Sequence, residues 1–133
     1  MLFRSPSLRG IVIAPSNPFL SIAPMLAIPG VETALRSRRV PALAVSPIIG
    51  GKAVKGPAAK ILRELGHEVS ALAVARHYRG LIDGFVLDRE DAALAPEVEA
   101  LGMRALVTNT IMRNEEVSAT LAAQVLEFAR ILA

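Results

Sequence analysis

The chain has 133 residues, of which 53% are hydrophobic, and it contains no cysteine. This length corresponds to one ordinary domain, and this apolar content excludes a disordered chain. The absence of cysteine excludes disulfide bonds, thiolate catalysis and cysteine-ligated metal sites. The two histidines, His67 and His77, lack the spacing of a metal motif.

The net charge of +3 is unevenly distributed along the chain. Residues 1–80 contain eleven Lys and Arg against three Asp and Glu, whereas residues 81–133 contain four against nine. The basic half also carries a glycine-rich segment, which favours an anionic ligand. Nucleic acid is the competing interpretation, but an aromatic content of 4% with no Trp leaves little to stack on bases. We therefore expect no nucleic-acid partner.

The uncharged stretch from Gly10 to Val31 has the length of a membrane span. Prolines interrupt it four times, and each removes a helical hydrogen bond that lipid demands. These prolines are Pro15, Pro18, Pro24 and Pro29. The apolar segment Ile11–Ala14 is also too short for a signal peptide. We expect a cytoplasmic protein with no membrane partner.

Strand-like and helix-like segments alternate along the chain, which predicts an α/β fold with a mostly parallel sheet. The four predicted strands are Gly10–Ala14, Val40–Val45, Gly84–Leu87 and Met103–Val107. The predicted helices are a short one capped by Ser21, one from Gly30 to about Arg36–Arg39, Ala58–Leu65 after Pro57, one from Ser70 to about Arg79, Ala92–Leu101 capped by Asp91, and Glu115–Leu132 after Asn114. No repeat or linker interrupts this pattern, so residues 1–133 are predicted to form a single domain.

Ligands of open parallel sheets bind beyond the carboxyl ends of the strands. Four loops follow the predicted strands: Pro15–Leu20, Pro47–Gly56, Asp88–Asp91 and Thr108–Arg113. The first two are rich in proline, and this topology predicts that they meet at one edge of the sheet.

The segment Ser46–Pro57 reads Ser-Pro-Ile-Ile-Gly-Gly-Lys-Ala-Val-Lys-Gly-Pro. Its glycines allow backbone N–H groups to approach a ligand closely, and Lys52 and Lys55 add mobile positive charge. The P-loop pattern fails, because Ala53 follows the lysine where that pattern requires Ser or Thr. The segment therefore predicts a phosphate-binding loop, and the alternative is a solvated turn whose lysines maintain solubility.

Polar side chains also follow the first and third predicted strands. Ser16, Asn17 and Ser21 can bind phosphate, ribose or base, although Ser-Asn-Pro is equally a turn signal and Ser21 a good cap. Asp88 is a candidate for holding Mg²⁺ or acting as a base, and alternatively a helix cap. No Ser–His–Asp arrangement or paired-glutamate spacing stands out, so the catalytic residues remain unassigned.

Three segments together resemble one family, the 2-phospho-L-lactate transferases of deazaflavin coenzyme biosynthesis, including relatives that use a phosphoenolpyruvyl group. They are Ala14–Ile22, Val45–Pro57 and Leu81–Asp88. The resemblance implies a Rossmann-like α/β fold and a Mg²⁺-dependent reaction. A phospholactyl or phosphoenolpyruvyl group would pass from a guanosine diphosphate adduct to a deazaflavin alcohol, and GMP would leave.

The resemblance also implies that the first two segments line the nucleotide–diphosphate site. The positions carried over are Ser16, Asn17, Ser21, Ser46, Gly50, Gly51, Lys52, Lys55 and Gly56. Such a reaction needs little covalent chemistry from the protein, because positioning and charge neutralisation provide most of the catalysis.

Members of this family are more than twice as long as this chain and open with a glycine-rich turn. The chain therefore resembles the carboxyl-terminal portion of the enzyme, and metal and deazaflavin contacts are expected from the remainder. Two alternatives to an enzyme follow: a non-catalytic nucleotide- or phosphate-binding module, and an assembly domain whose open sheet edge favours self-association. We expect a homo-oligomer.

Overall fold

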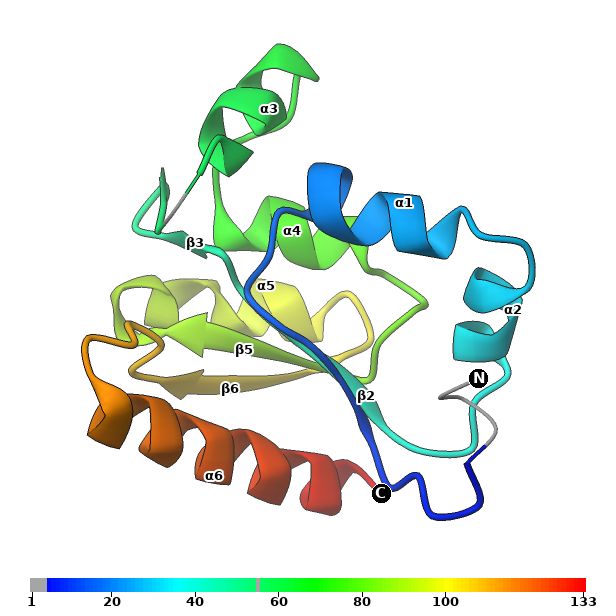
Figure 1. Cartoon of the computed structure of the whole chain (residues 1–133). Helices are drawn as coiled ribbons and strands as arrows, with labels where there is room; N and C mark the ends of the chain where they lie inside the picture. The colour runs from blue at the N-terminus through cyan, green and yellow to red at the C-terminus, as the bar shows by residue number, and fades with distance from the viewer. Residues whose placement is uncertain (1–4, 55) are drawn as a thin grey trace.

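The computed structural model describes residues 5–54 and 56–133. Its main sheet has four parallel strands in the order β1-β2-β5-β6 (Figure 1). These strands are β1 (Ile11–Ile13), β2 (Ala42–Val45), β5 (Gly84–Asp88) and β6 (Arg104–Thr108). The predicted Rossmann-like α/β fold is therefore confirmed, and the strand positions agree with the prediction to within two residues.

Short helical segments connect the strands, and one long helix follows β6. They are η2 (Pro18–Ile22), α1 (Ala23–Leu26), α2 (Val31–Arg36), α3 (Ala58–Glu64), α4 (Ala71–His77), η3 (Arg89–Leu94), α5 (Ala95–Glu99) and α6 (Glu115–Leu132). Within the described part of the chain, none of these helices combines the length and apolar character needed to cross a bilayer.

Two of the predicted helix caps are confirmed and two are wrong. The Ser70 hydroxyl accepts a hydrogen bond from Ala73 N at the start of α4, and Asn114 caps α6. Ser21 instead lies inside η2, whose cap is Asn17, because Pro18 already begins the helical turn. Asp91 lies inside η3, whose cap is Asp88.

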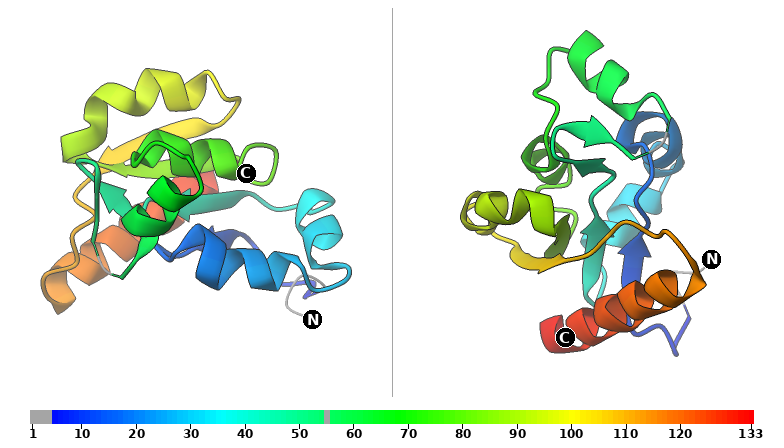
Figure 2. Two further views of the ribbon diagram at one scale, coloured as in Figure 1. Left: turned by 90° about the horizontal axis from the view of Figure 1, so that it is seen from above. Right: turned by 90° about the vertical axis from the view of Figure 1, so that its left-hand side faces the viewer.

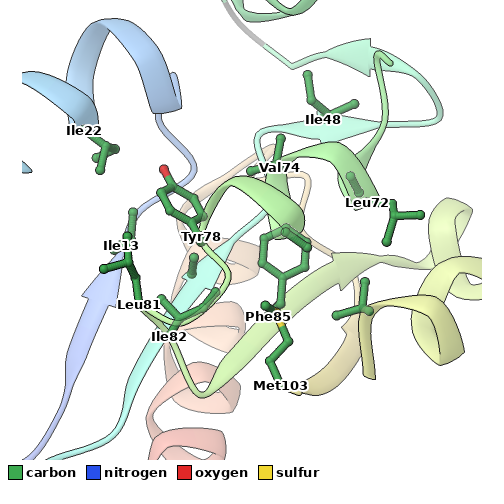
Figure 3. Close-up of a cluster of buried hydrophobic side chains, with 14 of the residues drawn as sticks. Ile13, Ile22, Ile48, Leu72, Val74, Tyr78, Leu81, Ile82, Phe85 and Met103 are labelled. Atoms are coloured by element: carbon green, nitrogen blue, oxygen red, sulfur yellow. The ribbon is translucent and has the colours of Figure 1, made fainter. Parts of the chain in front are cut away.

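The two faces of the sheet are covered unequally (Figure 2). Helix α6 covers one face, where Val125 and Phe128 pack on Leu43 of β2. Helices α1, α4 and α5 lie on the opposite side and form the larger core, in which Tyr78 and Phe85 are fully buried (Figure 3). Both faces of β2 are therefore buried, as is typical of a parallel strand covered on both sides.

Helix α6 packs closely on the sheet at Gly84, the first residue of β5. A Cβ atom at this position would lie 2.7 Å from Leu132 Cδ1 and 2.7 Å from Phe128 Cε1. Real Cβ atoms do not show such distances, so a larger residue here would force the ends of these two side chains to move. The glycine thus leaves the space that Leu132 and Phe128 occupy.

An antiparallel hairpin in the loop after β2 was not predicted from the sequence. Its strands are β3 (Ile48–Ile49) and β4 (Lys52–Ala53), with Ile49 opposite Lys52. Gly50 and Gly51 form the two-residue turn, with φ of +57° and +75°. Such a turn, with both φ angles positive, matches the twist of a hairpin and strongly favours glycine.

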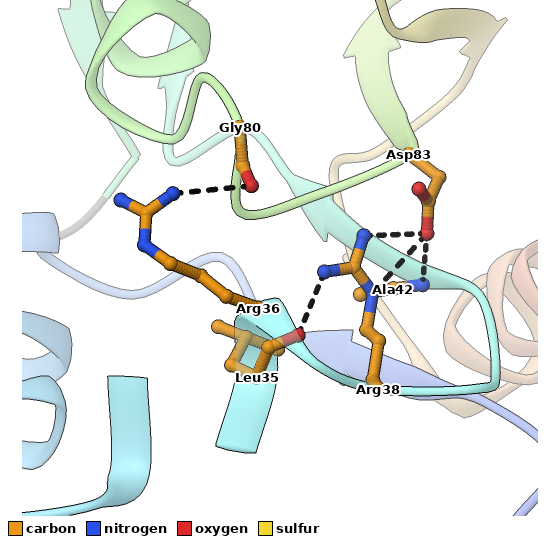
Figure 4. Close-up of polar contacts among 6 residues, drawn as sticks. All are labelled: Leu35, Arg36, Arg38, Ala42, Gly80 and Asp83. Carbon is orange, nitrogen blue, oxygen red and sulfur yellow. Dashed lines mark hydrogen bonds and ion pairs between the residues drawn. The ribbon is translucent and has the colours of Figure 1, made fainter. Parts of the chain in front are cut away.

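Polar contacts connect the strands at the end of the sheet where their amino termini lie, opposite the hairpin (Figure 4). Asp83 Oδ2 accepts a hydrogen bond of 2.8 Å from Ala42 N and pairs with Arg38 Nη2 at 2.7 Å. Arg38 Nη1 also donates to Leu35 O at 2.8 Å. These contacts join the starts of β2 and β5, and they hold Arg38 away from the edge where ligands of such sheets bind.

Candidate functional site

A cavity of about 260 Å³ opens at the carboxyl ends of β1, β2 and β6. It is lined by Pro15, Asn17, Ser46, Pro47, Val54, Thr110, Ile111 and Met112. Three loops meet there: the loop after β1, the hairpin loop after β2 and the loop after β6. The sheet topology thus brings the two proline-rich loops to one cavity, as predicted.

Asn17 lines this cavity, and its side chain contains a buried donor without a partner among the described residues. Its Oδ1 atom accepts hydrogen bonds from Phe19 N at 2.9 Å and Leu20 N at 3.1 Å. These two donors identify Oδ1 as the oxygen, so the other terminal atom is the NH₂ group. This Nδ2 atom is buried and has no hydrogen-bond partner among the described residues. A buried donor without a partner costs about 1–3 kcal/mol, which a ligand acceptor can recover.

Ser46 lines the cavity, but its hydroxyl is already occupied at the base of the hairpin. The side chain is buried, and its Oγ donates to Ile48 O at 2.8 Å and accepts from Ile48 N at 3.2 Å. Its backbone N donates to Val86 O at 2.9 Å. In this arrangement the hydroxyl sets the direction in which the hairpin leaves β2.

The other predicted binding residues that the structure describes do not line the cavity. Ser16 is half-buried, whereas Ser21, Gly50, Gly51, Lys52 and Gly56 are exposed. Lys52 lies on β4, two residues before Val54, which does line the cavity. Lys55 lies outside the described residues. The structure therefore brings Asn17 and Ser46 together and places Lys52 on an adjoining hairpin; the roles of all these residues stay predictions.

Asp88 joins the end of β5 to the loop after β6. Its Oδ1 accepts from Glu90 N at 3.0 Å, and its Oδ2 accepts from Thr110 N at 2.9 Å and Thr110 Oγ1 at 3.1 Å. Burial raises the pKa of this carboxyl, but these hydrogen bonds and the charge of Arg89 outweigh it, so the pKa lies below its ordinary value. Asp88 thus holds Thr110, a residue of the cavity wall that was not predicted from the sequence.

Asp91 makes a corresponding contact to the hairpin. Both of its carboxylate oxygens lie 3.2 Å from Gly50 N, which donates to them. Burial raises the pKa of Asp91, and the nearby negative charge of Asp88 adds to the rise despite this hydrogen bond. The contact joins residues far apart in sequence, so no local pattern could have predicted it.

The described residues do not identify a magnesium site. Across residues 5–54 and 56–133, no group of three or more Asp, Glu or His side chains is placed to hold a metal ion. Asp88, the predicted candidate, has both oxygens engaged by hydrogen bonds. Its side chain fits a structural role here better than a ligand role, and the need for Mg²⁺ stays a prediction.

Three larger hollows lie elsewhere on the described part of the molecule. One, of about 960 Å³, lies between the amino-terminal segment and α2 and includes Arg38. Another, of about 670 Å³, is mostly apolar and lies between β1 and the end of α6. The third, of about 390 Å³, is lined by Phe19, His67 and His77 among others. None of the three is lined by a residue predicted to bind a ligand, so the smaller cavity at the carboxyl ends of the strands is the candidate site.

The family model described as "2-phospho-L-lactate transferase CofD" matches residues 8–125. The chain belongs to the 2-phospho-L-lactate transferase family. The match includes every residue that lines the candidate cavity and every predicted binding residue. The family resemblance inferred from the three sequence segments is thus confirmed.

Curated relatives of this family match nearly all of the chain. A phosphoenolpyruvate transferase of Streptomyces griseus subsp. griseus is 44% identical over 120 residues, which cover 90% of this chain and 38% of the relative. A 2-phospho-L-lactate transferase of Methanosarcina barkeri is 43% identical over 112 residues, or 84% of this chain and 36% of the relative. The enzyme of the same name in Methanocaldococcus jannaschii is 36% identical over 118 residues, or 89% and 36%. The chain thus spans less than two fifths of the length of these relatives.

Proposed function

We propose that this chain forms the nucleotide–diphosphate site of a transferase that moves a phospholactyl or phosphoenolpyruvyl group from a guanosine diphosphate adduct to a deazaflavin alcohol. The acceptor's hydroxyl oxygen bonds to the phosphorus that carries the acid, and that phosphorus loses its bond to the bridging oxygen. The hydroxyl proton is released and GMP leaves. Family membership and relatives named for phospholactate and phosphoenolpyruvate support the transferase class.

The unpartnered amide of Asn17 is the observation that carries this proposal. Its side chain lines the cavity and its oxygen stabilises the loop, while its buried nitrogen has no hydrogen-bond partner among the described residues. A phosphate oxygen or a nucleotide carbonyl would satisfy that donor. Lys52 on the adjoining hairpin supplies a positive charge suited to the charge that develops on the diphosphate during transfer.

Three further features belong to the same proposal. The Mg²⁺ requirement rests on the family resemblance, and we assign it no ligand and no step. A cytoplasmic location and a homo-oligomeric state are likewise proposed, and light scattering of the purified chain measures the second directly.

Calorimetric titration with GDP, with and without Mg²⁺, tests the binding site. Asn17→Asp keeps the oxygen that caps η2 but replaces the free donor with negative charge, so GDP affinity should fall at least tenfold. Asn114→Asp is the matched control, because Asn114 caps α6 in the same way and does not line the cavity. Equal affinity in both variants, or no binding of millimolar GDP by the wild-type chain, would contradict the proposal.

A second assay separates transfer from binding alone. The chain is mixed with the guanosine diphosphate adduct and the deazaflavin alcohol, and GMP is measured. Release of GMP that depends on both substrates supports a transferase. Tight GDP binding without GMP release by the isolated chain would instead support the non-catalytic binding module.

A further inference from the structure

Among the described residues, the side chain of Asp91 makes the hydrogen bonds that tie the turn of the hairpin to a distant segment. Gly50 N donates to both carboxylate oxygens of Asp91, each at 3.2 Å. Asp91 is only 8% exposed, and it lies in η3, immediately beyond the carboxyl end of β5. The contact therefore connects the exposed tip of the hairpin to the rigid sheet.

The hairpin needs such an anchor, because it is very short. Each of its strands has two residues, and a two-stranded hairpin alone is marginally stable in water. Its base is held by the buried Ile48 and by the hydrogen bond from Val54 N to Pro47 O at 3.2 Å. Beyond that base, the Val69 carbonyl lies beside Gly51, and Asp91 supplies the side-chain hydrogen bonds to the β3–β4 turn.

This contact also changes what the glycine turn can offer a ligand. The Gly50 N–H group is consumed by Asp91, so in this conformation it is not available to bind an anion. A buried carboxylate beside an anion site is electrostatically unfavourable, which argues against a direct role of Asp91 in binding. Its geometry suits a positional role, in which it holds the hairpin that carries Lys52.

The segment that contains Asp91 fixes a second wall of the cavity as well. Three residues earlier, Asp88 accepts hydrogen bonds from the backbone and hydroxyl of Thr110. Residues 88–91 thus hold the hairpin after β2 with one carboxylate and the loop after β6 with another. Both held loops contribute residues to the candidate cavity.

We infer that Asp91 is a positioning residue for the anion site: it clamps the Gly50–Gly51 turn so that the hairpin holds Lys52 beside the cavity. This inference rests on the proposed function, because it presumes an anionic ligand at that site. It assigns Asp91 no contact with the ligand itself.

The test compares Asp91→Ala with Asp91→Asn, because the asparagine oxygen can still accept from Gly50 N. Two readouts are used: the hydrogen-exchange rate of the Gly50 amide by NMR without ligand, and the dissociation constant of GDP. Asp91→Ala should speed exchange at least tenfold and weaken GDP binding about five- to tenfold. Asp91→Asn should restore both to within about twofold of wild type.

Asn114→Ala is the matched control for general destabilisation. It removes the cap of α6, a loss of similar size to that of one hydrogen bond, and neither Asn114 nor its partner Val117 belongs to the turn or lines the cavity. Exchange at Gly50 and GDP affinity should both stay at wild-type values. If Asp91→Ala does not fold, Asp91→Glu replaces it, because the added methylene displaces the oxygens; it should give intermediate exchange and affinity.

Each outcome decides between the inference and the proposed function. Unchanged Gly50 exchange in Asp91→Ala overturns the anchor. Faster exchange with unchanged GDP affinity overturns the positioning role. An Asp91→Asn variant that binds GDP as weakly as Asp91→Ala also overturns the positioning role. Failure of the wild-type chain to bind GDP overturns the proposed function, and the anchor is then decided by the exchange measurement alone.

Discussion

The two proline-rich loops at the candidate cavity are held in different ways. The loop after β1 is held from within, because Asn17 accepts hydrogen bonds from the next two free backbone N–H groups. The loop after β2 is held from a distance, because its turn is anchored by Asp91, which lies 41 positions away in the chain. The first loop can therefore form from local sequence, whereas the second takes its position only when β5 and η3 are in place.

This difference indicates which substitutions should disturb each wall of the candidate cavity. A change to the Asn17 cap should act first on its own loop, because both hydrogen bonds of the cap lie within that loop. The hairpin and the loop after β6 depend on carboxylates at the end of β5, so a change at Asp88 or Asp91 should disturb walls to which neither residue belongs. The predictions below probe this contrast.

The largest effect is expected from Asp88→Ala. The change leaves the Thr110 N–H, its hydroxyl and the Glu90 N–H without their acceptor, so the free energy of unfolding should fall by about 3 kcal/mol or more. Thr110→Val, which removes only the hydroxyl, should cost about 1 kcal/mol. Urea denaturation at neutral pH measures both, and a loss below that of Thr110→Val would contradict the clamp.

The Asp88 effect should also depend on pH. The lowered pKa of Asp88 means that its ionised form stabilises the folded state above the pKa of the unfolded chain, about 3.9. This stabilisation is lost as pH falls through the lower pKa of the folded state. The difference in the free energy of unfolding between wild type and Asp88→Ala should therefore become smaller in acid. A difference that grows in acid would contradict this assignment.

Next in size is the loss of GDP affinity in Lys52→Ala. Removing one charge-assisted contact should weaken binding by about 1–3 kcal/mol without changing the unfolding midpoint. Lys60→Ala is the control, because Lys60 is also an exposed lysine but pairs with Glu64 on α3. Equal GDP affinity for the two variants by calorimetry would show that the hairpin lysine has no special role.

A smaller effect is expected from Asn17→Ala. Loss of the η2 cap should lower the free energy of unfolding by about 1 kcal/mol, whereas Asn17→Asp keeps the acceptor and should stay near wild type. Urea denaturation of both variants measures the difference. If both lose the same stability, the loop after β1 is not held by its own cap, and the contrast between the loops fails.

The smallest effect concerns the pH dependence of Asp91→Asn. Because burial raises the pKa of Asp91, its contribution to stability is fully present below the pKa of the unfolded chain and is lost as pH rises through the folded pKa. The asparagine does not titrate. The variant should therefore gain stability relative to wild type as pH rises from 3 to 7, measured as the free energy of unfolding by urea denaturation. A relative loss over this range would contradict the raised pKa.

Local sequence signals predicted most of the fold. Ser70 and Asn114 stand at helix starts where their side chains cap the first turn, and the alternating strands and helices gave the parallel sheet. Two caps were misassigned, because Ser21 and Asp91 are equally good capping residues by type. Pro18 and the hydrogen bonds of Asp88 decided the outcome, and neither effect is visible from residue type alone.

Topology predicted the place of the candidate site but not its construction. The carboxyl-edge rule brought Asn17 and Ser46 to one cavity. The paired glycines were interpreted as a ligand-binding loop, although their positive φ angles primarily serve a hairpin turn. The roles of Thr110 and Asp91 were missed because they arise from contacts between segments that are distant in sequence.

The missing side chain of Gly84 leaves room for the end of helix α6. Leu132 and Phe128 occupy the space above this glycine. A helix of 18 residues behaves as a stiff rod of about 27 Å, and the loop that contains Thr110, Ile111 and Met112 precedes its other end. A methyl group at Gly84 would displace these two side chains at one end of the rod, and whatever part of that displacement the helix backbone follows would reach the cavity rim at its other end.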